Sequence, residues 1–193
     1  MEKLRFSTEL KRYAKENTMK ISSLRNPFRS SLVNPFKSSL INPLKNSLIN
    51  PLKNSILNPS KNSMINPHKN STINPFKNST INPHKNSTLN PFKNSTVNPF
   101  KNSTINPFKT SNIPGVYLFD LKGNNMGFTV PANETVSLVY DLEGEPKYFT
   151  VMASDDVLLR YDFNGDWSQL WIANGNGAYN LFNLQSRWEG FTT

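Results

Sequence analysis

Side chains that commonly carry enzyme chemistry are scarce in this chain. The 193 residues include no cysteine, and both histidines lie before residue 113. Acid–base chemistry in the C-terminal part would therefore depend on carboxylates. The adjacent Asp155 and Asp156 are explained more simply as turn residues, and no serine has an evident base. The sequence predicts no catalytic site and no cofactor, and we expect that the protein is not an enzyme.

Two patterns resemble metal sites, and each has a simpler structural explanation. His68 and His84 would form rings of imidazoles around the axis of a trimer, or else they are small polar variants of a core position. The run Asp162-Phe163-Asn164-Gly165-Asp166 has the start of a calcium loop, but Ala173 stands where the EF-hand pattern needs glutamate. A type I′ hairpin turn at Asn164-Gly165 explains the same residues. We predict no metal site.

Four aromatic side chains near Asp and Asn residues could stack on a sugar: Trp167, Trp171, Tyr179 and Trp188. Gln169-Leu170-Trp171, followed by Gly177 and Tyr179, is similar to one lobe of a ricin-type β-trefoil lectin, over residues 155–188. That resemblance implies a glycan-binding lobe, with two further lobes supplied by other chains. The alternative is that these aromatics form the core of a β-sandwich.

Positive charge is concentrated in the middle of the chain. Residues 17–119 contain thirteen basic and no acidic residues, whereas residues 113–193 contain ten acidic and four basic residues. A lysine recurs every eight residues from Lys37 to Lys109. This ladder could contact a polyanion, either nucleic acid or an acidic capsid surface, or it could keep fibres soluble and apart. Because we expect the nearby aromatic rings to be interior, we do not expect nucleic acid as a partner.

The lysines belong to an octad that repeats eleven times without insertion or deletion, with Asn-Pro from 26–27 to 106–107. Recurrent proline excludes helix, so we place each Asn-Pro at a corner and the next six residues in a short extended facet. The aliphatic and ring slots should point inward, and Lys77 should point to water. The predicted shaft core comprises Ile73, Phe76, Ile81, Leu89, Phe92, Val97, Phe100, Ile105 and Phe108.

One octad buries too little apolar surface to offset the conformational entropy of ordering eight residues. Several chains sharing an apolar axis could be stable together. The period resembles the intertwined triple-stranded β-helix of phage cell-puncturing needles, although those families use glycine where this chain has pairs such as Asn82-Pro83. The alternatives are a disordered basic linker or a single-chain β-solenoid with two octads per coil.

Residues 113–193 read as a small all-β head with a sandwich-like core. Seven short runs rich in β-forming residues alternate with Gly- and Asn-rich turns: 116–121, 128–130, 135–142, 148–152, 157–163, 170–172 and 179–184. Residues 1–24 read as an amphipathic attachment helix with Leu4, Phe6, Leu10 and Tyr13 on one face. No signal peptide or membrane span is evident, so we expect synthesis in a host cytoplasm.

The three segments 1–24, 25–112 and 113–193 together resemble a bacteriophage head or tail fibre. That resemblance implies a homotrimeric virion protein that attaches to a capsid or tail protein through its N-terminus. Its head would set trimer register and meet a host-surface glycan. Two other functions remain open. The basic octads could bind nucleic acid or another polyanion, or tripeptides such as Asn26-Pro27-Phe28 could bind adaptor domains of the EH type.

Overall fold

The centre of the molecule is a closed antiparallel barrel of eight strands, in a computed structural model that describes residues 18–175 and 177–193. Strands pair in chain order, and β8 pairs with β1 to complete the ring. The all-β class is confirmed, but a closed barrel replaces the predicted sandwich. The strands are β1 (Tyr117–Asp120), β2 (Asn125–Pro131), β3 (Val136–Tyr140), β4 (Pro146–Ser154), β5 (Val157–Asp162), β6 (Trp167–Ala173), β7 (Tyr179–Phe182) and β8 (Trp188–Thr192).

Four hairpins with one turn design build the barrel. Asp120, Asp141, Asp162 and Asn183 are spaced by 21 residues, and each carbonyl accepts a hydrogen bond from the N–H three residues later, at 2.9–3.1 Å. Gly165 has φ 98°, whereas Asn164 is absent from the residues with positive φ. These turns are therefore type I turns followed by a left-handed residue, and the predicted type I′ turn is wrong. The prediction also missed β8.

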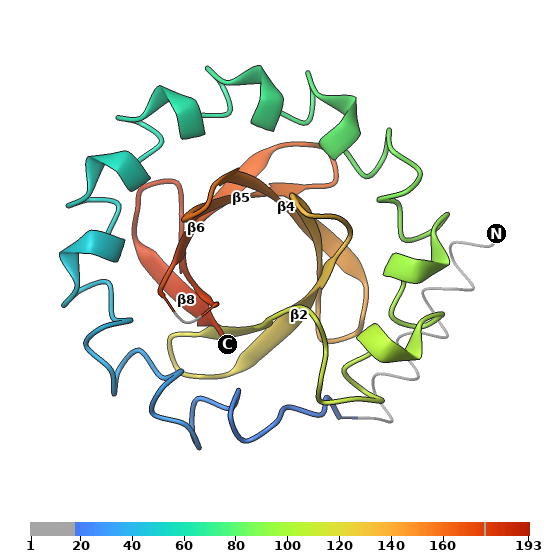
Figure 1. Cartoon of the computed structure of the whole chain (residues 1–193), viewed down its shortest axis with the longest axis horizontal. Helices are drawn as coiled ribbons and strands as arrows, with labels where there is room; N and C mark the ends of the chain where they lie inside the picture. Colours follow the sequence, from blue (N-terminus) through green and yellow to red (C-terminus); the bar gives the residue numbers. More distant parts are fainter. Residues whose placement is uncertain (1–17, 176) are drawn as a thin grey trace.

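Residues 18–112, hereafter the belt, encircle the barrel (Figure 1). A turn at each Asn-Pro is followed in most octads by one turn of 3₁₀-helix. The carbonyl of Asn74, for example, accepts hydrogen bonds from the N–H groups of Lys77 (3.1 Å) and Asn78 (2.8 Å). The predicted extended facets are therefore wrong. The 3₁₀ turns are η1 (Ser47–Ile49), η2 (Ser55–Leu57), η3 (Ser63–Ile65), η4 (Ser71–Ile73), η5 (Ser79–Ile81), η6 (Ser95–Val97) and η7 (Ser103–Ile105).

The belt closes on itself. The N–H of Lys20 donates to the carbonyl of Pro107 at 2.7 Å, and the Lys20 ammonium donates to the carbonyl of Lys109 at 3.1 Å. The Arg25 guanidinium donates to the carbonyl of Gly115 at 2.7 Å, which ties the start of the belt to the entry of the barrel. In Figure 1 the belt runs clockwise from blue to green, and the barrel strands run in the opposite sense from yellow to red.

One hydrophobic core joins belt and barrel. Belt aliphatics such as Ile65, Leu89 and Val97 pack in the same cluster as Phe128 and Phe149 of the barrel wall. Side chains alternate along the strands, so the opposite set faces the lumen. That second cluster consists of Leu118, Val139, Leu158, Trp171 and Leu181. The octads therefore pack on the outer wall of their own barrel. Winding with sister chains into a shaft is not the geometry observed.

Within residues 18–175 and 177–193, the helical segments lack the length and the apolar character that a membrane span needs.

Candidate nucleic-acid interface

Asparagine side chains set the geometry of each octad. The Asn78 side-chain oxygen accepts the N–H of Thr80 at 3.1 Å, and its amide donates back to the carbonyl of Thr72 at 2.6 Å. Asn74 likewise accepts from the N–H of Phe76 at 2.9 Å and donates to the carbonyl of Pro67 at 2.8 Å. Aspartate could accept these bonds but has no amide to donate. The double role explains why asparagine recurs in a segment without acidic residues.

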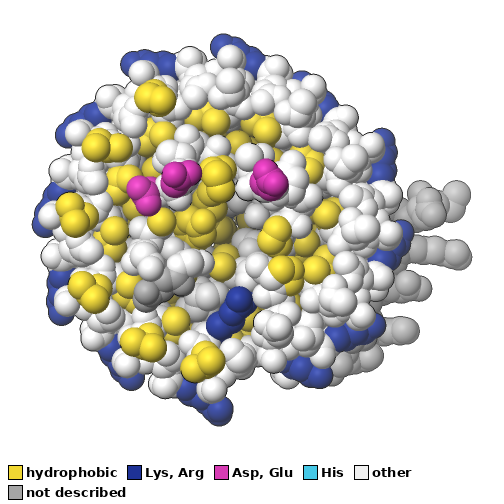
Figure 2. All heavy atoms as spheres, in the orientation of Figure 1, with side chains coloured by type: hydrophobic (Ala, Val, Ile, Leu, Met, Phe, Trp, Pro, Cys, Tyr) yellow, Lys and Arg dark blue, Asp and Glu magenta, His cyan; other side chains and the backbone are white. Residues whose placement is uncertain are grey.

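This geometry fixes which slots face the barrel. The aliphatic residue and the proline of most octads are buried, with Ile73 at 6% and Leu89 at 1% exposure. The basic residue three positions after the Asn of each Asn-Pro pair lies on the outside and is exposed, as expected for Lys77. Viewed along the barrel axis, the belt and the barrel together form a disc (Figure 1). Basic side chains therefore surround the edge of this disc (Figure 2). We call this edge the basic rim; it comprises Arg29 and Lys37, Lys45, Lys53, Lys61, Lys69, Lys77, Lys85, Lys93, Lys101 and Lys109.

Most of the predicted ring-slot residues do not face the core; Phe108, which is buried, is the exception. Phe76 is 57% and Phe92 39% exposed, and Phe100 is half-buried. The Asn-Pro turn directs proline inward and carries the next residue outward. Of the predicted core residues, those that are buried are Ile73, Ile81, Leu89, Val97, Ile105 and Phe108.

Several of these rings lie against the hairpin turns of the barrel. A Cβ added at Gly123 would lie 2.7 Å from the Phe28 ring, and one at Gly144 would lie 2.2 Å from the Phe100 ring. Phe76 lies against Gly165 in the same way. Phe28 nevertheless remains 66% exposed, so part of its ring meets solvent.

The result is an exposed ring next to an exposed cation in several octads, as in Phe76-Lys77 and Phe92-Lys93. Alternating aromatic and basic side chains are the chemistry that proteins use to bind single-stranded nucleic acid. This arrangement was not predicted, because the rings were expected to lie inside. The Phe-Lys dipeptides themselves were the available signal.

The histidines and the predicted glycan residues do not converge. The His68 ring packs edge-on against Trp167, with 6.2 Å between ring centres, and the His84 ring packs edge-on against Phe163, with 5.4 Å between ring centres. The two imidazoles therefore belong to separate ring contacts. Trp188 lies 5.3 Å from Phe36. Trp171 is fully buried in the lumen, 6.3 Å from Tyr179. The four aromatics therefore form no shared sugar platform.

Residues 155–188, which resemble a trefoil lobe, form hairpins of the closed barrel. The proposed attachment residues Leu4, Phe6, Leu10 and Tyr13 lie outside the described residues.

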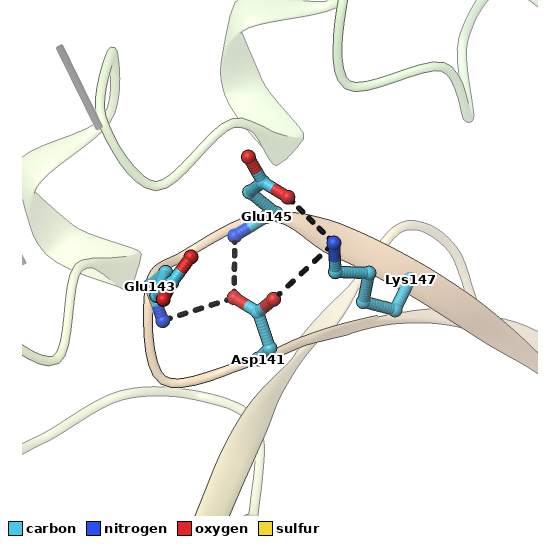
Figure 3. Close-up of polar contacts among 4 residues, drawn as sticks. All are labelled: Asp141, Glu143, Glu145 and Lys147. Carbon is cyan, nitrogen blue, oxygen red and sulfur yellow. Dashed lines mark hydrogen bonds and ion pairs between the residues drawn. The ribbon is translucent and has the colours of Figure 1, made fainter. Parts of the chain in front are cut away.

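Carboxylates at the hairpin turns stabilise the backbone. Asp162 accepts the N–H of Asp166 at 2.9 Å, which accounts for the calcium-like run. Asp141 accepts the N–H groups of Glu143 and Glu145 (Figure 3). The carboxylates of these three residues lie within 4.8 Å of one another, but Lys147 pairs with Asp141 and Glu145. The hydrogen bond that Lys147 donates to the Glu145 carboxylate raises the Lys147 pKa, as expected for an ion pair.

One face of the disc also carries exposed aliphatic side chains. The last slot of the octad is apolar in the first half of the belt and threonine in the second half. An arc of apolar side chains follows the blue-to-teal part of the belt (Figures 1 and 2). These residues are 71–75% exposed: Leu24, Leu32, Leu40, Leu48, Ile56 and Met64.

Comparisons with protein-family models, with curated proteins and with solved structures gave no match.

Proposed function

We propose that this protein binds single-stranded nucleic acid along the basic rim. The observation that carries the proposal is a closed ring of like charge with exposed aromatic rings beside it. A merely soluble surface is served by mixed charges, whereas every octad here has a basic residue at this slot. Ammonium groups would contact phosphates, and rings such as Phe76 would stack on bases.

The size of the rim favours a flexible strand over a duplex. Eight strands about 4.8 Å apart and tilted by about 40° give a barrel radius of roughly 8 Å. A packed layer adds about 10 Å, and the lysine side chains bring the rim radius to roughly 20–25 Å. Duplex DNA has a persistence length of about 500 Å and would touch such a rim only at a tangent. A single strand can follow the curve and meet most of the lysines.

The salt dependence of binding tests the proposal. Oligothymidylate long enough to circle the rim should bind with a slope of log K against log salt of about −6, since each phosphate contact contributes roughly −0.7 for single strands. A duplex of equal length should give a slope no steeper than about −3, because it meets few lysines. Absence of oligothymidylate binding at low salt would contradict the proposal, as would equal slopes for the two forms.

Matched variants separate charge from stacking. Replacing Lys69, Lys77 and Lys85 with glutamine should reduce the slope by about 2. Phe76→Leu should weaken binding while leaving the slope unchanged, because it removes a stacking ring and no charge. The variant should preserve the fold, since leucine stands at the same slot in Leu44 and Leu52. A change in slope with Phe76→Leu would argue against a stacking role.

The virus-fibre function and the homotrimer remain predictions. Their physical premise was that octads need sister chains to become ordered, and the barrel wall removes that need. Light scattering tests the trimer directly, since one chain has a mass of 21.9 kDa.

A further inference from the structure

A second site is suggested by a cavity of about 230 Å³ in the barrel lumen, at the end that carries the four hairpin turns. We call it the Arg160 cup. Leu118, Met126 and Val139 supply apolar wall, and Tyr148 and Arg160 supply polar atoms. Trp171 is buried in the same lumen cluster as Leu118 and Val139, so the middle of the barrel is filled.

Among the described residues, Arg160 makes no direct ion pair with a carboxylate. Its Nε–H donates to the Ser168 hydroxyl at 3.1 Å, and its guanidinium lies 4.0 Å from the centre of the Tyr148 ring. A guanidinium has five N–H donors, and the other four have no acceptor among the described residues. No carboxylate oxygen of the described chain lies within 4 Å of it. Burial lowers the Arg160 pKa, which reflects the cost of holding this charge.

The neighbouring carboxylates are committed elsewhere. Glu189 accepts hydrogen bonds from the side-chain amides of Gln169 and Asn183, each at 2.9 Å. Asp141, at the edge of the cup, accepts turn N–H groups and pairs with Lys147 (Figure 3). Asp141 and Lys147 thus pair with each other, and among the described residues the Arg160 guanidinium is offset only by the more distant carboxylate of Glu189, which it does not contact.

We propose that the Arg160 cup binds a small organic anion, with its carboxylate or phosphate group on the Arg160 guanidinium and its apolar part against Leu118, Met126 and Val139. A guanidinium presents paired donors that match such oxyanions in a bidentate manner. The cavity is smaller than a pocket for a drug-sized ligand, so the ligand is small. A purely structural role is disfavoured, because an apolar side chain of similar volume would fill the lumen without the cost of a buried charge.

The test uses the full chain with benzoate and phenyl phosphate as probes and benzamide as the uncharged control, at constant ionic strength. At least one of the anions should raise the melting temperature of the wild type in a dose-dependent way, and benzamide should not. Which anion binds decides between the carboxylate and the phosphate source. If neither anion binds by calorimetry, the proposal is overturned.

Three variants locate the site. Arg160→Met should abolish the anion effect while leaving the melting temperature of the free protein equal or higher. Arg187→Met, which removes an exposed arginine near the same end, should respond to anions as the wild type does. If Arg160→Met does not fold, Arg160→Lys decides, because it keeps the charge but loses the paired donors and should bind about tenfold more weakly. Unchanged affinity in either Arg160 variant overturns the proposal.

This inference is independent of the rim, since no rim lysine lines the cup. The Arg160 variants should leave the salt slope of oligothymidylate binding unchanged.

Discussion

The Tyr161 hydroxyl donates a 2.7 Å hydrogen bond to the carbonyl of Ile73, 88 residues away in sequence. Tyr140 makes the same bond to the carbonyl of Val97 at 2.7 Å, and Tyr117 bonds to that of Lys20 at 2.8 Å. In the fourth hairpin the side-chain amide of Asn180 donates to the carbonyl of Ile41 at 2.9 Å. Polar groups on the barrel wall therefore fasten the belt at intervals around its circumference.

Tyr161→Phe should lower the free energy of unfolding by about 1–3 kcal/mol, because the buried carbonyl of Ile73 loses its donor. Phenylalanine occupies the equivalent position in two sibling hairpins, as Phe119 and Phe182, so the ring itself should fit. Urea unfolding with an unchanged m-value measures the effect. A variant as stable as the wild type would show that the bond does not fasten the belt.

High pH should loosen the belt. Burial raises the pKa of Tyr117 to about 12, from an ordinary value of 10.0, and it also raises the pKa values of Tyr140 and Tyr161. Below pH 10 these phenols are neutral in both states and their contribution is complete. Above pH 10 the unfolded chain loses its protons first, so stability falls as pH rises towards 12. Chemical denaturation between pH 8 and 12 should show this decline, and Tyr117→Phe should reduce its steepness. A flat profile would contradict it.

Asn78→Asp should destabilise the belt by about 1 kcal/mol, since aspartate keeps the bond to Thr80 but cannot donate to the carbonyl of Thr72. Asn82→Asp should cost more, because Asn82 is only 4% exposed and its amide donates to the carbonyl of Pro75. Ser79→Asp is the control for added charge, since Ser79 is exposed. Thermal melts rank the three variants, and equal losses for Ser79→Asp and Asn78→Asp would refute the amide role.

Gly144→Ala and Gly177→Ala form a matched pair. Both glycines have positive φ, 74° and 69°, so alanine is strained at each by about 1–2 kcal/mol. Only Gly144 lies beneath a ring, that of Phe100, so Gly144→Ala should cost about 1 kcal/mol more. The double variant Gly144→Ala with Phe100→Leu should recover that extra loss. Equal losses for the two single variants would show that Phe100 does not cover the turn.

Much of the local structure could be predicted from sequence. Gly123, Gly144 and Gly165 lie in turns as their neighbours indicated, and the apolar residues before most Asn-Pro pairs, such as Ile73, are buried. These features depend on contacts within a few residues. The 21-residue spacing of Asp120, Asp141 and Asp162 was present in the sequence and would have indicated a repeated hairpin.

The rest depended on contacts that local patterns do not contain. Phe76 and Ile73 are both apolar neighbours of one Asn-Pro, and only the direction of the turn decides that one is exposed and the other buried. The partner of the octads was also not evident, because Ile73 meets Tyr161 across 88 residues. Sequence pattern alone could not distinguish sister chains from the chain's own barrel as the covering surface. Arg160 was not predicted as a site residue, because a single arginine in a strand does not indicate a binding site.

The closed belt has a consequence for how this gene can vary. Tandem repeats in DNA readily gain or lose copies by slippage during replication. Here eleven copies complete one lap of a barrel whose perimeter is set by its strands. Adding a twelfth copy would leave Lys20 unable to reach Pro107. Losing one copy, so that ten remain, would leave part of the barrel wall uncovered. The perimeter of the barrel thus matches a single number of octads.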